Sequence, residues 1–271
     1  MNKTFIIISL FFILMAVACN PKPEKPVNDE FSQRTQNDTL LPTSTTGQVV
    51  KHHYYTLSYN EDYENAEWVA YKLSPKQLSK RQIERPRFIR DPLVKTRSAH
   101  YKNYYPNGYE KGHLVPAADM RFDTLAFDET FYTSNVSPMD HYFNSGIWNN
   151  LEKQVRYWVK RYGDLYIVTG GILQPGLERI GREEVAVPDE FYKIVLDYKD
   201  PKYPRMIAFI IPHKDLPDSD LRDFVVPVDS IEKRTGIDFF PALPDAIENK
   251  LEAETHPREW KFVRFESWQN H

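Results

Sequence analysis

The sequence predicts an α+β domain of the mixed α/β kind, and three observations support this prediction. The 271 residues are 41% hydrophobic and 27% charged, which is typical of one globular domain of moderate size. Short apolar or alternating runs, typical of strands, lie on both sides of residues 144–161. Residues 144–161 are the longest stretch with the apolar spacing of a helix. Strand-rich segments around one long helix indicate an α+β domain.

The first residues predict an export signal. Lys3 gives a short positive start, and residues 5–17 are predominantly apolar, yet too few for the roughly 20 residues of a membrane span. The apolar run leads to Cys19, the only cysteine, in a setting that resembles a bacterial lipoprotein cleavage site. We expect residues 1–18 to be a signal peptide and Cys19 to be lipidated. An ordinary cleaved signal, in which Cys19 is idle, is the alternative.

This signal places the protein outside the cytoplasm. With lipidated Cys19 it would be attached to a membrane of the bacterial cell envelope, and the sequence leaves open whether the domain faces the periplasm or the exterior. Residues 19–50 are rich in Pro, Thr, Asn and Gln, so we expect them to form a flexible linker. Residues 51–271 are expected to fold as one domain without internal repeats and, lacking a second cysteine, without disulfides. The sequence does not decide between a monomer and a homodimer.

The domain begins with two aromatic, alternating runs joined by an acidic turn, which predict a pair of strands. The long helix is expected to end at Gly163. A short polar helix is expected at residues 74–84, followed by an irregular basic stretch. The expected strands are residues 53–59, 67–72, 129–136, 165–170, 191–196 and 206–211.

Positive charge is concentrated between Ala70 and Lys111. This segment contains eleven Lys and Arg residues and three acidic residues, although the net charge of the whole chain is -3. Clustered cations neutralise phosphates, so one interpretation is a face that binds a polyanion. The other is a solvated basic surface without a partner. Charge alone does not separate the two.

The long helix carries two different edges. Its core-facing seam consists of apolar residues at spacings of three or four, namely Ile147, Leu151, Val155, Trp158 and Val159. Asn144, Trp148, Glu152 and Arg156 recur at spacing four and are expected to line a neighbouring edge. This edge is either an exposed polar surface with a weak ion pair, worth about 0.3–0.5 kcal/mol, or the side of a site. An amide oxygen, a carboxylate and a guanidinium suit a hydrated cation and a phosphate.

Three segments together resemble the DNA/RNA non-specific endonucleases of the ββα-metal (His-Me finger) class. They read YEKGHLVPAADM, TFYTSNVSP and FNSGIWNNLEKQVR, and they match the family's motifs at His113, Asn135, Asn144, Glu152 and Arg156. The two asparagines are nine positions apart, as in the family. The resemblance covers most of the domain and implies the ββα-metal nuclease fold, with a central, mostly antiparallel sheet flanked by helices.

The resemblance also implies a metal-dependent endonuclease that hydrolyses DNA and RNA with little sequence specificity. His113, with an ordinary pKa of about 6.5, would be the general base. Asn144 would bind Mg²⁺, or Mn²⁺ or another divalent cation, which takes few protein ligands. Glu152 would hold a water on the metal, Arg156 would contact the phosphate, and Asn135 would position either His113 or a water.

Substrate binding is implied for the basic residues ahead of the histidine. The family places an arginine before a Phe-x-x-Asp element, matched here by Phe88 and Asp91, and both Arg85 and Arg87 are candidates. Lys111 stands where the family has arginine, which loses a bidentate grip on phosphate.

Two further departures and two alternatives complete the interpretation. Glu110 replaces the family's aspartate, and Met139 replaces a glutamine. The sequence contains neither H-E-x-x-H nor G-x-S-x-G, which argues against a zinc protease or an esterase. The remaining alternative is an envelope-anchored nucleic-acid-binding lipoprotein with weak or no turnover.

Overall fold

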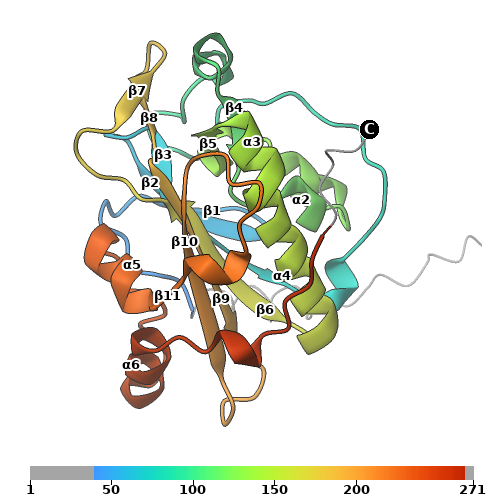
Figure 1. Ribbon diagram of the computed structural model, residues 1–271. Helices are drawn as coiled ribbons and strands as arrows, with labels where there is room; N and C mark the ends of the chain where they lie inside the picture. Colours follow the sequence, from blue (N-terminus) through green and yellow to red (C-terminus); the bar gives the residue numbers. More distant parts are fainter. Residues whose placement is uncertain (1–39, 266–271) are drawn as a thin grey trace, which may run out of the picture.

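The computed structural model describes residues 40–265, so the predicted signal peptide and the predicted lipidation at Cys19 lie outside the described residues. The domain is built on a seven-stranded sheet with the order β1-β2-β3-β6-β9-β10-β11 (Figure 1). Every neighbouring pair in this sheet is antiparallel. The α+β prediction, with an antiparallel sheet flanked by helices, is therefore confirmed.

The elements have the following bounds. The sheet consists of β1 (Val49–Lys51), β2 (Tyr55–Asn60), β3 (Asn65–Leu73), β6 (Leu165–Gly171), β9 (Glu190–Asp197), β10 (Arg205–Pro212) and β11 (Val225–Val226). Two further sheets have two strands each. One pairs β4 (Glu110–His113) with β5 (Val136–Met139), and the other pairs β7 (Glu178–Ile180) with β8 (Val185–Val187). The helices are α2 (Thr124–Glu129), α3 (His141–Phe143), α4 (Asn149–Tyr162), α5 (Val228–Thr235) and α6 (Asp245–Ala253).

The two faces of the sheet have separate hydrophobic cores. Successive residues of a strand point to opposite faces, so Val69 of β3 packs with the seam of α4, whereas Trp68 packs with α5 and α6. The expected seam of the long helix is confirmed, since all of its members are at least 95% buried. Figure 1 shows α4 crossing the sheet beside α3, β4 and β5, away from α5 and α6. The site described below is therefore built beside α4.

The long helix differs from the single element expected at residues 144–161. It begins at His141, where the Asp140 side chain accepts hydrogen bonds from the backbone N–H groups of Tyr142 and Phe143. Residues Asn144–Trp148 then form a π-helical turn, in which Gly146 has the non-helical angles φ -92° and ψ -111°. This turn interrupts the spacing of four residues expected from Asn144 to Arg156. The direction of the Asn144 side chain is therefore not set by the geometry of α4.

Two other predicted elements are wrong. The helix predicted at residues 74–84 is reduced to one 3₁₀ turn, Pro75–Gln77, which buries no residue and therefore has no packing to extend it. The strand predicted at residues 129–136 begins only at Val136. Its first part instead ends α2, which is capped by the Asp123 carboxylate, and then forms a 3₁₀ turn. Capping and turn chemistry here override the aromatic composition that suggested a strand.

The linker predicted for residues 19–50 is also wrong from residue 40 onward. Leu40 is buried, and β1 pairs with β2. The carbonyl of Thr43 accepts a 2.8 Å hydrogen bond from Trp68 Nε1, and the N–H of Thr45 donates at 2.9 Å to the buried Glu67 carboxylate. Residues 40–50 thus satisfy polar groups in the core of the sheet. No helix between residues 40 and 265 is long and apolar enough to cross a membrane.

Removing residues 1–50 is expected to destabilise the domain relative to removing only residues 1–39. Without residues 40–50 the buried Glu67 carboxylate keeps the hydrogen bond from Ser58 but loses those from Thr45, and the Trp68 N–H loses its acceptor. These losses cost about 2 kcal/mol of unfolding free energy. Urea unfolding of the two proteins measures the difference. Equal midpoints and slopes would show that residues 40–50 do not belong to the folded unit.

Candidate active site

His113 ends strand β4 and is set among aromatic rings. Its ring centroid lies 5.4 Å from that of Phe88 and 5.1 Å, edge to face, from that of Phe131. The Nε2 atom is buried and has no hydrogen-bond partner among the described residues. Burial and the positive charge of Arg85 lower the pKa of His113 to about 3, below the value of 6.5 expected from the sequence. The imidazole is therefore neutral at pH 7 and its Nε2 can accept a proton, although the lowered pKa makes it a weaker base than an exposed histidine.

Asn135 is a positioning residue, because its amide group is used entirely by the backbone. Its Oδ1 accepts a 2.8 Å hydrogen bond from the N–H of Val115, and its Nδ2 donates to the carbonyls of Val115 and Thr130 at 3.1 and 3.0 Å. The side chain is fully buried. Of the two roles expected for Asn135, the geometry supports fixing the chain that follows His113, rather than holding a water.

Arg85 and Lys111 share the aromatic surroundings of His113. The Arg85 guanidinium carbon lies 5.2 Å from the ring centroid of Phe131, and Lys111 Nζ lies 5.5 Å from that of Phe88. Burial and the neighbouring charge of Arg85 lower the pKa of Lys111. Two cations that repel one another favour the binding of an anion between them. Arg85 and Arg87 are both exposed, but among the described residues the contacts with these rings belong to Arg85, which makes it the stronger candidate.

The loop that carries Arg85 is anchored by Asp91. Burial alone would raise the pKa of this carboxyl, but hydrogen bonds from His52 and Ser134 lower it. The backbone of Ile89 also bonds to that of Phe131 and Thr133. The Phe-x-x-Asp element seen in the sequence therefore holds the arginine loop against the residues that precede β5.

Asn144 is joined to the histidine strand through Glu110. Asn144 Nδ2 donates a 2.7 Å hydrogen bond to Glu110 Oε2, and the other carboxylate oxygen lies 2.7 Å from His141 Nδ1. This contact uses the amide nitrogen of Asn144, so the amide oxygen is the atom that remains for a cation. The replacement of aspartate by glutamate thus keeps an acidic partner for the helix. Sequence reasoning treated Glu110 only as a departure and did not assign it this role.

Met139 and Gly112 explain another departure from the family pattern. Met139 is fully buried opposite Glu110 in the β4–β5 pair. A Cβ at Gly112 would lie 2.2 Å from Met139 Sδ, so the methionine fills the space that this glycine leaves. Met139 is therefore a packing residue. The methionine found here, where the family has glutamine, serves the packing of the β4–β5 pair.

Glu152 and Arg156 belong to a buried charge network on α4. Arg156 Nη1 donates to Asp119 Oδ1 at 2.8 Å and lies 3.9 Å from Glu152 Oε2. Asp119 also accepts a 3.1 Å hydrogen bond from the Tyr71 hydroxyl. Burial raises the pKa of Glu152 to about 7. Because part of the guanidinium is held by Asp119, Arg156 supports the Glu152 edge in addition to any contact with phosphate. Sequence reasoning missed Asp119 and Tyr71.

Lys193 is a second residue missed by sequence reasoning. It lies on β9, is 1% exposed, and places Nζ 4.6 Å from the ring centroid of Trp148 and 3.2 Å from Thr169 Oγ1. Burial lowers the pKa of Lys193 to about 8, while Glu152 acts in the opposite direction. A lysine within the apolar run FYKIVL was the available signal, since buried lysines need a partner.

A divalent metal fits these donors. Asn144 offers an amide oxygen, Glu110 beside it offers a carboxylate, and α4 carries the carboxylate of Glu152. Oxygen donors, few in number, suit a hard cation that keeps most of its water. In the ββα-metal nucleases, a strand pair that carries a histidine lies beside a helix that carries an asparagine and a glutamate. Here the strand pair is β4 with β5.

Comparison with known proteins supports this class. A sequence profile described as "DNA/RNA non-specific endonuclease" matches residues 34–246, so the chain belongs to the DNA/RNA non-specific endonuclease family. It is 33% identical over 204 residues to "Nuclease EXOG, mitochondrial" of Danio rerio, a match covering 70% of this chain and 60% of that protein. It is 32% identical over 203 residues to "Endonuclease G, mitochondrial" of Homo sapiens, covering 69% and 67%.

A solved structure agrees with the sequence relatives. The match is to "Crystal structure of the EndoG/EndoGI complex: Mechanism of EndoG inhibition", with a TM-score of 0.69 and 28% identity. It covers 77% of this chain and 89% of that chain. The ββα-metal nuclease fold inferred from the motifs is therefore confirmed. The sequence match nevertheless spans less than two thirds of the Danio rerio protein.

The site predicts opposite titration behaviour for two histidines. His113 is expected to remain neutral at pH 5, because its pKa is lowered, whereas hydrogen bonding to Glu110 raises the pKa of His141 above 6.5. Protonating His113 is disfavoured in the folded state, so its contribution to stability is present above pH 6.5 and is lost as the pH falls toward 3.

NMR titration of the ring signals measures both values. Arg85→Ala is expected to raise the pKa of His113, because it removes a positive charge, and to leave that of His141 unchanged. A midpoint near 6.5 for His113 in the unmodified protein would contradict the burial of its ring.

Proposed function

We propose that this protein is a metal-dependent endonuclease that hydrolyses the phosphodiester bonds of DNA and RNA with little sequence specificity. The observation that supports this most strongly is the environment of His113. A neutral imidazole with an unpartnered Nε2 lies in the same aromatic setting as the cations Arg85 and Lys111. A base next to an anion-binding pair is what hydrolysis of a phosphodiester requires.

In the proposed mechanism, His113 Nε2 accepts a proton from the attacking water. Arg85 and Lys111 bind the phosphate and offset its negative charge, and Asn135 keeps the chain after His113 in place. Asn144, oriented by Glu110, and Glu152 hold the hydrated cation. Bound Mg²⁺, Mn²⁺ or another divalent ion supplies Lewis-acid stabilisation of charge on the phosphoryl and leaving oxygens.

The mechanism supports action on both DNA and RNA. Attack by water does not use the ribose 2′-OH, so it does not distinguish the two sugars. The side chains at the site are positioned for phosphate and metal, whereas sequence readout needs donors and acceptors at base edges. We therefore propose that both nucleic acids are substrates.

A second candidate function is an anchored nucleic-acid-binding protein without turnover. Lys111 supports it, because a lysine with a lowered pKa in place of arginine holds phosphate without a bidentate contact. The site geometry favours the nuclease, since binding alone needs neither an unpartnered histidine nor an oriented asparagine. The cleavage experiment below separates the two.

We also propose that the nuclease is exported and attached to a membrane of the bacterial cell envelope through lipidated Cys19. The apolar run at residues 5–17 and the position of the single cysteine support this proposal. The composition of residues 20–39, with Pro, Asn, Thr and Gln and few large apolar residues, supports a tether after Cys19.

The anchor predicts that Cys19→Ala abolishes labelling by radioactive palmitate in a bacterial host. It should also move the protein from the membrane fraction to the soluble fraction, while the nuclease activity of the released domain is retained. Unchanged labelling and fractionation in Cys19→Ala would refute lipidation at this residue.

The proposed mechanism predicts that His113→Ala and Asn144→Ala each lower the cleavage rate by at least 100-fold, as loss of a general base or a metal ligand does. Plasmid DNA and a structured RNA are incubated with the protein containing residues 40–271, with Mg²⁺, with Mn²⁺ or with a chelator. The chelator should abolish cleavage of both substrates, and fresh divalent ion should restore it.

His256→Ala is the matched control, because His256 is partly exposed and its side chain pairs with Glu254, away from the candidate site. Its cleavage rate should equal that of the unmodified protein. Cleavage by His113→Ala at the unmodified rate would refute the assigned base. Tight binding without cleavage in any divalent ion would establish the second candidate function.

A further inference from the structure

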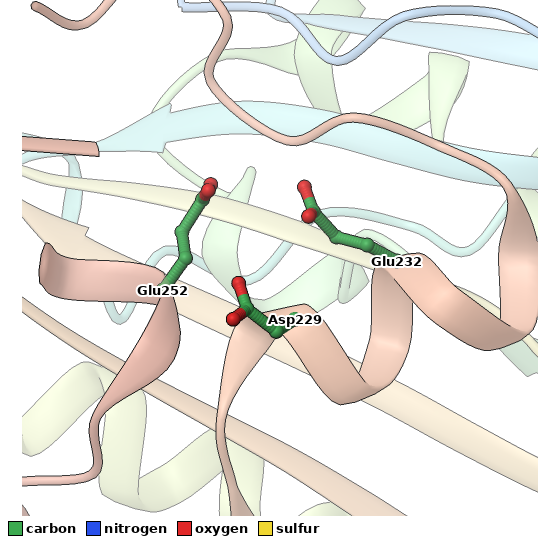
Figure 2. Close-up of side chains that lie close together, drawn as sticks. All are labelled: Asp229, Glu232 and Glu252. Atoms are coloured by element: carbon green, nitrogen blue, oxygen red, sulfur yellow. The ribbon is translucent and has the colours of Figure 1, made fainter. Parts of the chain in front are cut away.

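Three carboxylates lie close together on the side of the sheet away from α4. Asp229 and Glu232 belong to α5, and Glu252 belongs to α6. One oxygen of each lies within 4.8 Å of the others, and Figure 2 shows the three side chains converging on one space between the helices. The apolar faces of α5 and α6 pack on Trp68 and Tyr192. This acidic cluster is therefore remote from His113, and no catalytic residue takes part in it.

Glu252 is the unusual member of the cluster. The residue is 5% exposed, and its Oε1 atom is buried without a hydrogen-bond partner among the described residues. Oε1 of the adjacent Glu248 is buried and unpartnered in the same way. A buried carboxylate oxygen without a partner carries a large desolvation cost. Such an atom, aimed at two further carboxylates, points to a missing positive partner.

The surrounding groups do not provide that partner. None of the three carboxylates forms an ion pair with a Lys, Arg or His side chain of residues 40–265. Glu232 Oε1 accepts a 2.9 Å hydrogen bond from the N–H of Phe239, which fixes this carboxylate but does not neutralise it. Among the described residues, the three carboxylates therefore have no cationic side chain as a partner where α5 meets α6.

We propose that Asp229, Glu232 and Glu252 form a binding site for Ca²⁺ that joins α5 to α6. The donors are all oxygens, which select a hard cation and disfavour Zn²⁺ or Cu²⁺. The three oxygens lie within 4.8 Å of one another, so a single cation could contact all of them. Ca²⁺ accepts several carboxylates in a flexible geometry, whereas Mg²⁺ releases its water reluctantly.

Asp229 and Glu232 lie within the region that the family profile matches, and Glu252 lies beyond its end at residue 246. The ion would have a structural role, since it ties the C-terminal helix to the body of the domain. It adds to the proposed nuclease and does not depend on it.

The test is calorimetric titration of metal-free protein with CaCl₂, using the full mature chain carrying Asn144→Ala to remove the candidate catalytic metal ligand. One equivalent of Ca²⁺ is expected to bind and to raise the thermal unfolding midpoint by several degrees, with a smaller effect of Mg²⁺. Glu252→Gln, which keeps the shape of the side chain, should weaken Ca²⁺ binding at least tenfold and remove the shift in the midpoint.

Glu254→Gln is the matched control, because Glu254 is exposed and contacts His256. It should bind Ca²⁺ as the parent does. If Glu252→Gln fails to fold, the exposed Asp229→Asn replaces it with the same expected loss. Absence of Ca²⁺ binding by the parent, or equal binding by the folded cluster variants, would overturn the proposal. Cleavage by Glu252→Gln on the Asn144-containing background should remain unchanged.

Discussion

The hydrogen bond between Glu110 and Asn144 is the contact on which the site depends. It joins the strand that ends in His113 to the start of the long helix, two segments whose backbones belong to different elements. The π-helical turn at Asn144 and the flexible geometry of Gly146 allow the asparagine to turn toward this strand while α4 keeps its apolar seam on the sheet. Within one helical segment, the first turn thus carries the candidate metal ligand Asn144, and α4 carries the apolar residues that pack on the sheet.

The site combines two electrostatic environments. Around His113, aromatic packing and Arg85 keep the imidazole neutral. Along α4, burial raises the pKa of Glu152, and Arg156, Asp119 and Lys193 surround it with charges of both signs. Binding of a divalent cation would favour the ionised form of Glu152, since an adjacent positive charge lowers the pKa of a carboxyl. A bound cation would therefore stabilise the negatively charged form of the Glu152 carboxyl.

The sequence predicted the parts of the fold that follow from periodicity. Alternation identified β2 and β3, apolar runs identified β6, β9 and β10, and spacing identified the buried seam of α4. It failed where local hydrogen bonds or distant partners decide the structure. The polar segment at residues 40–50 was interpreted as a linker, because the sequence does not show that its backbone groups satisfy Glu67 and Trp68.

The sequence identified the motif residues, but it did not show which residues each of them contacts. The environment that lowers the pKa of His113 depends on Phe131 and Arg85, which are distant in the chain. Glu110 gained its role only from its contact with Asn144, and Lys193 and Asp119 are brought to α4 by the sheet and by the turn after β4. Spacing along the chain predicts which residues share one face of a helix or strand. Contacts between residues of different elements can be seen only in the folded structure.

Chemical rescue tests the central claim most directly, namely that His113 is the base of a hydrolytic site assembled with Asn144. Plasmid cleavage by His113→Ala is measured in Mg²⁺ with increasing imidazole. The account predicts that neutral imidazole restores part of the lost rate to His113→Ala and none to Asn144→Ala, because the second variant retains its base. Unmodified activity of His113→Ala without imidazole, or equal rescue of both variants, would contradict it.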